Sequence, residues 1–351
     1  MDLSYFNARL RGMRGRLIRK ADYDGFAALP GLEQYAERLR ATAYGPYVET
    51  ASSRMERLDD IIAAAIRAGL AASFADMQDA APPEAAVYIR SLLSVWEVYD
   101  LKAIVRAVSR AIKPEEALDT LVPAGEFDNA AIKTLLTNSK DVPDLVSFLE
   151  TWGSRYARPL KDGLAAYGKN GSTAAMEHNL DAVGVAAALK ELPASSTDAA
   201  VIRWIIASRI DAQNVMTLLK VCGEGAVGMD AALLFLDGGT RLGRKTFSSL
   251  IASKDRDELL AALASALDDA GWKAVIAGAD ADEPGLLEEQ LNCAGDAHLR
   301  RLAVIEPLSI ALAASYMQMK AREAKNLRVI ARGIAFGIPD EVLKRYIVYP
   351  M

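Results

Sequence analysis

The nearest approach to a nucleotide-binding motif is the segment Gly238-Gly239-Thr240-Arg241-Leu242-Gly243-Arg244-Lys245-Thr246. A phosphate loop wraps phosphate oxygens with the backbone N–H groups of a glycine-rich turn. It follows a β-strand and ends in Gly-Lys-Ser or Gly-Lys-Thr at the start of a helix. Here Lys245-Thr246 is present, but Arg244 stands where the motif has glycine, and no strand pattern precedes it. We therefore expect a turn between helices and no direct nucleotide binding.

Histidine and cysteine also lack the spacing of known metal or redox sites. A structural zinc site typically needs pairs of Cys or His ligands separated by about two to four residues. The two histidines, His178 and His298, and the two cysteines, Cys222 and Cys293, match no such spacing. The isolated thiols are typical of a reducing compartment. The sequence therefore predicts no catalytic, metal or cofactor-binding residues, and a protein that is not an enzyme.

A different set of polar residues recurs along the chain. Three ten-residue segments, 97–106, 211–220 and 323–332, share an acid, then Asn or Asp three residues later, then a base six residues further on. The Asn or Asp positions are Asp100, Asn214 and Asn326, and the basic positions are Arg106, Lys220 and Arg332. We predict a structural role, in which these side chains bridge neighbouring helices through ion pairs or buried hydrogen bonds. A functional polar role is the alternative, since Asn is a mediocre helix former.

The spacing between these segments is nearly constant. Asp100 and Asn214 lie 114 residues apart, and Asn214 and Asn326 lie 112 apart. Other landmarks repeat the step of 114 residues, namely Gly125 with Gly239 and Leu145 with Leu259. Such a regular step indicates repeated structural units.

The period predicts three helical repeat units and a partial further copy. The predicted boundaries are 1–92, 93–206, 207–318 and 319–351. The first unit has a degenerate motif, because Asn7 lacks an acid three residues upstream. The last segment holds a complete motif helix but only part of a unit.

Composition and periodicity favour an all-α fold. The chain is 52% hydrophobic but only 7% aromatic, and Ala and Leu, the best helix formers, supply much of the apolar fraction. Around Asn326, apolar residues follow the three-to-four spacing of a helix face. Long helices are predicted over 48–72, 84–110, 173–192, 197–221 and 307–333.

Charge and hydropathy narrow the classes of partner. A formal net charge of -5 disfavours a nucleic-acid-binding protein. No apolar run approaches the roughly 20 residues of a membrane span. The N-terminal segment is nevertheless basic. A solvent-exposed helix face is the first interpretation, and the alternative is that Arg9, Arg11, Arg14 and Arg16 form a surface that faces a partner.

Several segments together resemble one protein family. Tyr5-Phe6-Asn7-Ala8-Arg9-Leu10-Arg11-Gly12-Met13, followed by Arg16-Leu17, is similar to the opening of the C subunit of archaeal and bacterial V/A-type rotary ATPases and of its eukaryotic counterpart, the d subunit. Tyr44-Gly45-Pro46-Tyr47 and the closing segments 323–328, Arg332-Gly333 and Gly337-Ile338-Pro339 also resemble that family. The resemblance covers the whole chain, and it depends on the order of the motifs, the length and the repeat.

The resemblance implies a fold and a function. The fold would be three pseudo-threefold related helical domains that form a funnel. The function would be that of a non-catalytic central-stalk subunit, which binds other stalk subunits and the membrane proteolipid ring and couples ATP turnover to proton or sodium transport. Such a subunit is cytoplasmic, peripheral on the membrane through other subunits, and needs no cofactor.

Two other classes remain as alternatives. One is a stand-alone helical adaptor or scaffold, but such proteins usually repeat about every 34–47 residues. The other is a helical enzyme with a site between domains, which requires clustered polar residues that the sequence does not show.

Overall fold

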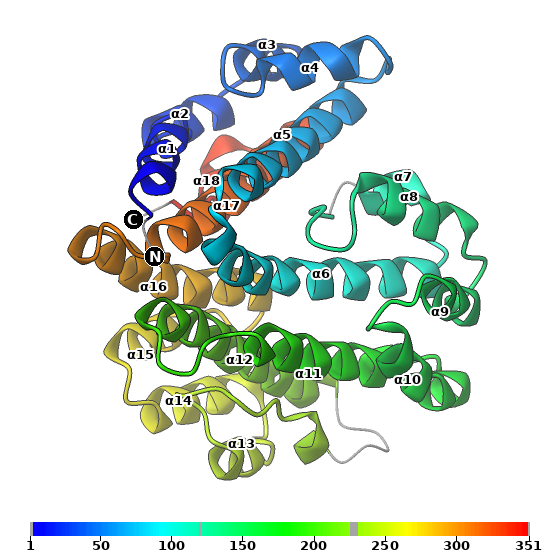
Figure 1. Cartoon of the computed structure of the whole chain (residues 1–351). Coiled ribbons are helices and arrows are strands. Elements are labelled where there is room, and N and C mark those ends of the chain that lie inside the picture. Colours follow the sequence, from blue (N-terminus) through cyan, green and yellow to red (C-terminus); the bar gives the residue numbers. More distant parts are fainter. Residues whose placement is uncertain (1–2, 119–120, 225–230, 350–351) are drawn as a thin grey trace. The chain divides into compact units, whose positions relative to one another are not determined.

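The computed structural model describes residues 3–118, 121–224 and 231–349. Within these ranges the regular elements are 18 α-helices and two short 3-10 helices, with no β-strand (Figure 1). An isolated bridge between Ala124 and Phe127 is the nearest approach to a sheet. The all-α prediction is confirmed.

The chain divides into two compact units. The larger consists of Met1–Leu192 and Pro307–Pro350, and the smaller of Pro193–Glu306. The predicted repeat boundaries at 92, 206 and 318 fall inside α6 (Ala86–Ser109), α12 (Thr197–Glu224) and α17 (Ala311–Ala335). These three helices carry the recurring decamers, and we call them the motif helices. Each decamer lies in the second half of its helix. A boundary placed a few residues before the decamer therefore falls within that helix.

The first helix group of the larger unit joins segments from both ends of the described chain. Its members are α1 (Ser4–Arg14), α2 (Lys20–Ala27), α3 (Leu32–Arg40), α4 (Gly45–Ser52), α5 (Leu58–Ala80), α17 and α18 (Asp340–Tyr346). α17 packs against α1, α2, α3, α5 and α18, and in Figure 1 it lies alongside α5. The last motif helix thus completes a group that the first 80 residues begin.

The second group of this unit is continuous in sequence. Its elements are η1 (Pro83–Ala85), α6, α7 (Pro114–Leu118), α8 (Asn129–Asn138), α9 (Val142–Thr151), α10 (Ala157–Asn170) and α11 (Ala174–Lys190). α6 packs against α8, α9 and α11. A core that includes Leu101, Ile104, Leu145 and Leu160 is excluded from solvent, and burial of this apolar surface stabilises the group.

The smaller unit repeats this plan with its own core. Its elements are α12, η2 (Ala231–Leu234), α13 (Arg244–Leu250), α14 (Arg256–Ala266), α15 (Ala270–Ala277) and α16 (Pro284–Ile305). α12 packs against α13, α14 and α16. Val215, Phe247, Leu259 and Trp272 are buried in one apolar cluster.

Helix starts follow capping chemistry. Asp128, Asp141, Asp255 and Asp269 each precede a helix and accept a hydrogen bond from a backbone N–H of its first turn. An N-cap side chain of this kind satisfies a donor that has no partner within the helix. These aspartates therefore fix where α8, α9, α14 and α15 begin.

The predicted helix over 48–72 is wrong. α4 ends at Ser52 and α5 begins at Leu58, so that residues 53–57 lie outside both helices. The Ser52 hydroxyl donates to the carbonyl of Val48, and such local bonds compete with the helical backbone. Asp59 and Asp60 favour a new start, since acids stabilise the positive end of the helix dipole.

Leu145→Ala and Leu259→Ala test whether the two cores are equivalent. Both side chains are fully buried, one in α9 and one in α14, at positions that the repeat step relates. We expect each substitution to lower the free energy of unfolding by about 2–5 kcal/mol, because it removes apolar contacts and leaves a cavity. Denaturant titrations measure the loss. Leu233→Ala, at a position 65% exposed, is the control and should have little effect; a loss from only one of the core substitutions would contradict equivalence.

Candidate functional site

Two of the motif helices hold the same pair of hydrogen bonds at their Asn position. Nδ2 of Asn214 donates to the carbonyl of Leu236 at 2.9 Å, and the N–H of Leu236 donates to Oδ1 of Asn214 at 2.9 Å. Asn326 forms the same reciprocal pair with Val348, at 3.0 and 3.1 Å. We call this arrangement the amide anchor. The Asn side chain both donates to the carbonyl and accepts from the N–H of one residue, as a residue on a neighbouring β-strand would.

Asp100 occupies the amide-anchor position of α6. Its Oδ1 accepts a hydrogen bond of 2.8 Å from the N–H of Val122. Val122 follows Asp100 by 22 residues, and the same separation holds for the anchors of Asn214 and Asn326. The three repeats therefore fix the chain at the same distance in sequence from the motif helix.

The anchored residues belong to short segments outside helices. The pairs Leu121-Val122, Phe235-Leu236 and Ile347-Val348 bring apolar side chains to each motif helix. Five of these six side chains are buried, the exception being the half-buried Val348. The anchor positions thus hold a returning segment against the motif helix, whereas the sequence predicted a bridge between two helices.

The acid three residues before each amide anchor is also buried and bonded. Oδ2 of Asp211 accepts hydrogen bonds of 3.0 Å from the N–H groups of Thr240 and Arg241, and its Oδ1 accepts one of 3.1 Å from Leu242. Nη1 of Arg241 lies 3.5 Å from the same carboxyl group. We call this arrangement the acid anchor. A Cβ added at Gly239 would lie 2.1 Å from Oδ1 of Asp211, so the glycine is required for this close approach.

Arg241 links the acid anchor of α12 to the next helix start. Its Nε donates to Oδ2 of Asp269 at 2.8 Å, and its guanidinium lies over the ring of Trp272, 4.7 Å from the centroid. Partial burial opposes ionisation of Asp269, but the hydrogen bond from Arg241 lowers the pKa of that carboxyl group. One side chain therefore joins the acid anchor, the N-cap of α15 and the apolar core.

Glu97 forms the acid anchor of α6 with different partners. Its Oε1 accepts from the N–H of Glu126 at 3.0 Å, and its Oε2 accepts from Arg155 at 2.6 Å and from the hydroxyl of Tyr156 at 2.7 Å. Burial and the nearby Glu97 carboxyl group raise the pKa of Tyr156. Gly125, with φ +61°, would place an added Cβ 1.6 Å from Oε1 of Glu97. Gly125 therefore makes room for the acid anchor of its own repeat, as the glycine one repeat later does for Asp211.

Glu323 forms the acid anchor of α17 with the N-terminal helix group. Its Oε2 accepts from the N–H of Ile18 at 2.6 Å, and its Oε1 accepts from the Tyr44 hydroxyl at 2.9 Å and from Nζ of Lys320 at 2.6 Å. Burial, followed by the Glu323 carboxyl group, raises the pKa of Tyr44. Ile18 and Tyr44 precede Glu323 by 305 and 279 residues. The third acid thus bonds to the opposite end of the chain.

The basic positions of the decamers all lie at the surface of their helices. Arg106, Lys220 and Arg332 are exposed. Arg106 nevertheless makes a two-point ion pair with Glu177 on α11, with Nε 2.8 Å from Oε1 and Nη2 on Oε2. Burial opposes ionisation of Glu177, and the Arg106 bond lowers its pKa. The basic residue of the α6 decamer therefore forms an ion pair between α6 and α11.

The predicted partner-facing arginines lie on and just after α1. Arg9, Arg11 and Arg16 are exposed and Arg14 is half-buried. Nη2 of Arg11 donates to the carbonyl of Pro307 at 3.1 Å. The same helix also holds a buried amide, Asn7, whose Nδ2 donates to the carbonyls of Pro307 and Ser309. α1 therefore fixes the segment that leads into α17 and leaves most of its arginine side chains accessible.

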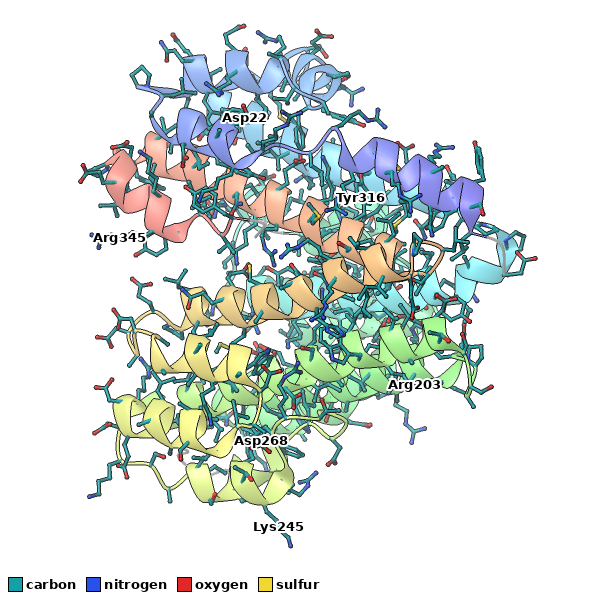
Figure 2. The ribbon with its side chains drawn as sticks, turned by 90° about the vertical axis from the view of Figure 1, so that its left-hand side faces the viewer. Asp22, Arg203, Lys245, Asp268, Tyr316 and Arg345 are labelled. Carbon is teal, nitrogen blue, oxygen red and sulfur yellow. The ribbon has the colours of Figure 1, made fainter. Side chains whose placement is uncertain are left out.

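The loop that resembled a phosphate cradle surrounds the carboxyl group of Asp211. Its backbone N–H groups point at that side chain, and Figure 2 shows the side chain of Lys245 extending away from the protein. The lysine of a phosphate loop instead reaches back over the loop toward the phosphates. The anion that this loop holds is thus an acidic residue of the protein itself.

The remaining polar candidates are dispersed. His298 stacks on Trp204, with the ring centroids 4.3 Å apart, and neither Cys222 nor Cys293 forms a disulfide. Across residues 3–118, 121–224 and 231–349, no three His, Cys, Asp or Glu side chains are grouped to hold a metal ion. Among the helices described, none has the length and apolar character to cross a membrane.

These features define a helical protein with internal repeats. Its buried polar residues form hydrogen bonds to other segments of the same chain. The sequence matches the ATP synthase (C/AC39) subunit family over residues 6–346, and the chain belongs to that family. It is similar to the C subunit of the A-type ATP synthase from Haloferax volcanii, with 27% identity over 98% of this chain and 97% of that protein. The corresponding protein of Archaeoglobus fulgidus is 27% identical over 98% and 96% of the two chains, and that of Pyrococcus furiosus 25% over 98% and 90%.

Two parts of the site were missed from the sequence. The partners of the acid anchors were missed, although two of them follow the repeat: the hydroxyls of Tyr44 and Tyr156, which lie 112 residues apart (156 − 44), bond to Glu323 and Glu97. Backbone N–H groups supply many of the other contacts, and these carry no sequence signal. The segment Ile347-Val348 is the third copy of the anchored apolar pair, although the last unit was predicted to be only partial. A search for two apolar residues ending 22 positions after each Asn or Asp would have found it.

Asn214→Leu and Asn326→Leu test the amide anchors. Each substitution leaves the N–H and carbonyl of one buried or half-buried residue without the side-chain partner. We expect each to lower the free energy of unfolding by about 1–3 kcal/mol. Thermal and denaturant unfolding measure the loss. Gln213→Leu, at the half-buried position beside Asn214, is the matched control; a loss from one Asn substitution and none from the other would show that the anchors are not used equivalently.

Proposed function

We propose that this chain is a non-catalytic coupling subunit of a V/A-type rotary ATPase. It binds the central-stalk subunits and the membrane proteolipid ring, and it turns with them. It lies on the cytoplasmic side, peripheral to the membrane through those partners, and couples ATP turnover to proton or sodium transport. Membership of the ATP synthase (C/AC39) subunit family, together with relatives named as the C subunit of A-type ATP synthases, supports this assignment.

The observation that carries the proposal is the double anchoring of each motif helix. A part that transmits torque must resist local opening, and its stiffness comes from packed cores and hydrogen-bonded buried polar groups. In α6, α12 and α17 the acid and amide anchors lie one helical turn apart and fasten the loops that follow or surround the helix. Each helix group is thereby built to move as one body.

The same anchors support a non-catalytic role. Catalytic acids are usually held in a cleft with substrate access and a shifted pKa. Glu97, Asp211 and Glu323 are instead fully enclosed and bonded to backbone N–H groups, tyrosine hydroxyls or cationic side chains. We infer that bond cleavage takes place in other subunits.

Coupling is tested by removing the subunit and assaying two activities on the same vesicles. ATP hydrolysis by heads that retain the stalk should persist without it, whereas ion pumping should be lost, because torque no longer reaches the membrane. Adding back the purified protein should restore pumping. Loss of hydrolysis in stalk-containing heads that lack the subunit would contradict the proposal.

Affinity purification of the tagged protein from gently solubilised membranes distinguishes a rotary-ATPase subunit from a stand-alone helical adaptor. The proposal requires stalk and ring subunits in the recovered complex. Recovery of neither class of subunit would overturn it.

The arginine surface of α1 is proposed to face an acidic partner. Arg9→Glu combined with Arg14→Glu should weaken assembly several-fold, mainly in the association rate, because the acidic partner then repels α1. Binding kinetics to the purified partner complex and ion pumping measure this effect. The matched control is Lys133→Glu with Lys140→Glu, which makes the same charge change at exposed positions in and after α8. Equal effects of the two pairs, or a loss of folded structure in the α1 variant alone, would count against a partner-facing α1.

A further inference from the structure

The amide anchor of α6 differs from the other two in one atom. Asn214 and Asn326 each present an Nδ2 that donates to the carbonyl of the residue 22 positions later. Asp100 has a carboxyl oxygen, Oδ2, instead of that NH2 group. Oδ2 is buried without a hydrogen-bond partner, while Oδ1 keeps its bond to the N–H of Val122. An ionised carboxylate can only accept hydrogen bonds. As a carboxylate, Asp100 would leave one charged oxygen buried and unsatisfied.

A proton on Oδ2 resolves this conflict. A protonated carboxyl group has one O–H donor and one carbonyl acceptor, and this is the donor and acceptor pattern of an Asn side chain. The repeat geometry places the group where its counterparts donate to a backbone carbonyl. We infer that Asp100 is a neutral carboxylic acid in the folded protein at neutral pH, and that its Oδ2–H donates to the carbonyl of Val122.

The electrostatic surroundings agree with this assignment. Asp100 is fully buried, and burial raises the pKa of its carboxyl group well above the usual range. Two influences oppose the rise, namely the hydrogen bond from Val122 and the positive charge of Arg328 on α17. Glu97, one turn earlier on α6, adds to the rise. Burial is the largest of these effects, as expected when a charge is removed from water.

A neutral Asp100 makes the stability of the α6 repeat sensitive to pH, whereas the repeats of α12 and α17 have Asn at this position. Loss of the proton would turn the donor at Oδ2 into a second acceptor and set it against the Val122 carbonyl. The anchored segment contains Gly125 and Glu126, which pack on and bond to Glu97. Deprotonation of Asp100 should therefore loosen both anchors of α6, whereas the Asn residues of the other two anchors do not titrate.

The direction in which stability changes with pH follows from the proton that Asp100 binds in the folded and unfolded chains. An unfolded chain releases this proton near about pH 3.9, whereas the folded chain retains it to a higher pH. Stability contributed by the neutral form is complete below the unfolded-state pKa and is lost as pH rises toward the folded-state pKa. A paired carboxylate would show the opposite trend.

The test compares wild type with Asp100→Asn across pH. Above about pH 4, the unfolding equilibrium constant of wild type should rise relative to that of D100N by about tenfold per pH unit, until the folded-state pKa is reached. At neutral pH, the infrared difference spectrum should contain the C=O stretch of one protonated carboxyl group in wild type that D100N lacks. A difference in stability that does not change with pH, a wild type that gains stability relative to D100N as pH rises, or the absence of that band would overturn the inference.

Two further variants provide controls. Asn214→Asp places a carboxyl group in the amide anchor of α12 and should acquire the same fall in stability with pH; a flat or rising profile would contradict the geometric argument. Asp76→Asn removes an exposed acid of α5 and should leave the pH profile of wild type unchanged. Amide hydrogen exchange at Val122 gives a local reading, and its protection should decrease with rising pH in wild type more than in D100N.

Discussion

A buried polar side chain that bonds to the backbone of its own returning chain is the interaction on which each repeat depends. The segments at Val122, Leu236 and Val348 lie outside helices, so their N–H and carbonyl groups have no helical neighbours to pair with. Burying such groups unpaired costs free energy comparable to the hydrogen bonds they lose. The amide anchor removes that cost and lets two apolar residues enter the core. One turn earlier on each motif helix, the acid anchor accepts hydrogen bonds from backbone N–H groups of loops that have no other partner in a helix.

The phosphate-loop resemblance in 238–246 has a physical explanation. Phosphates and carboxylates are both anions, and a turn rich in glycine can point several N–H groups at either. Gly239 is required here because the carboxyl group of Asp211 approaches the backbone closely. The sequence feature that suggests ligand binding is therefore genuine anion-binding chemistry, but its anion is part of the fold.

The all-α class, the repeat step and the positions of the buried acids and amides could be predicted, because they depend on helix periodicity and on recurring residue types. Most partners of those residues could not. Glu97 uses an arginine and a tyrosine, Asp211 uses three consecutive N–H groups, and Glu323 uses a lysine and a tyrosine. The two tyrosines, Tyr44 and Tyr156, follow the repeat because they lie 112 residues apart (156 − 44). The other donors differ in type and position, so they carry no common signal. The exposed base of α6 likewise pairs with Glu177, a residue of a different helix that the spacing within the decamer does not indicate.

The pairing of α17 with the N-terminal helices sets an order for synthesis of the protein. Ile18, Tyr35 and Tyr44 bond to residues of α17 that lie 305, 292 and 279 positions later. Contacts this distant in sequence form slowly, and during translation their partners do not yet exist. The helix groups of α6 and α12 can fold as they leave the ribosome, but α1 to α5 must wait with apolar faces uncovered until α17 emerges. Helices α1 to α5 are thus made before α17 and completed only after it, and apolar surface that is uncovered in that interval is prone to aggregation.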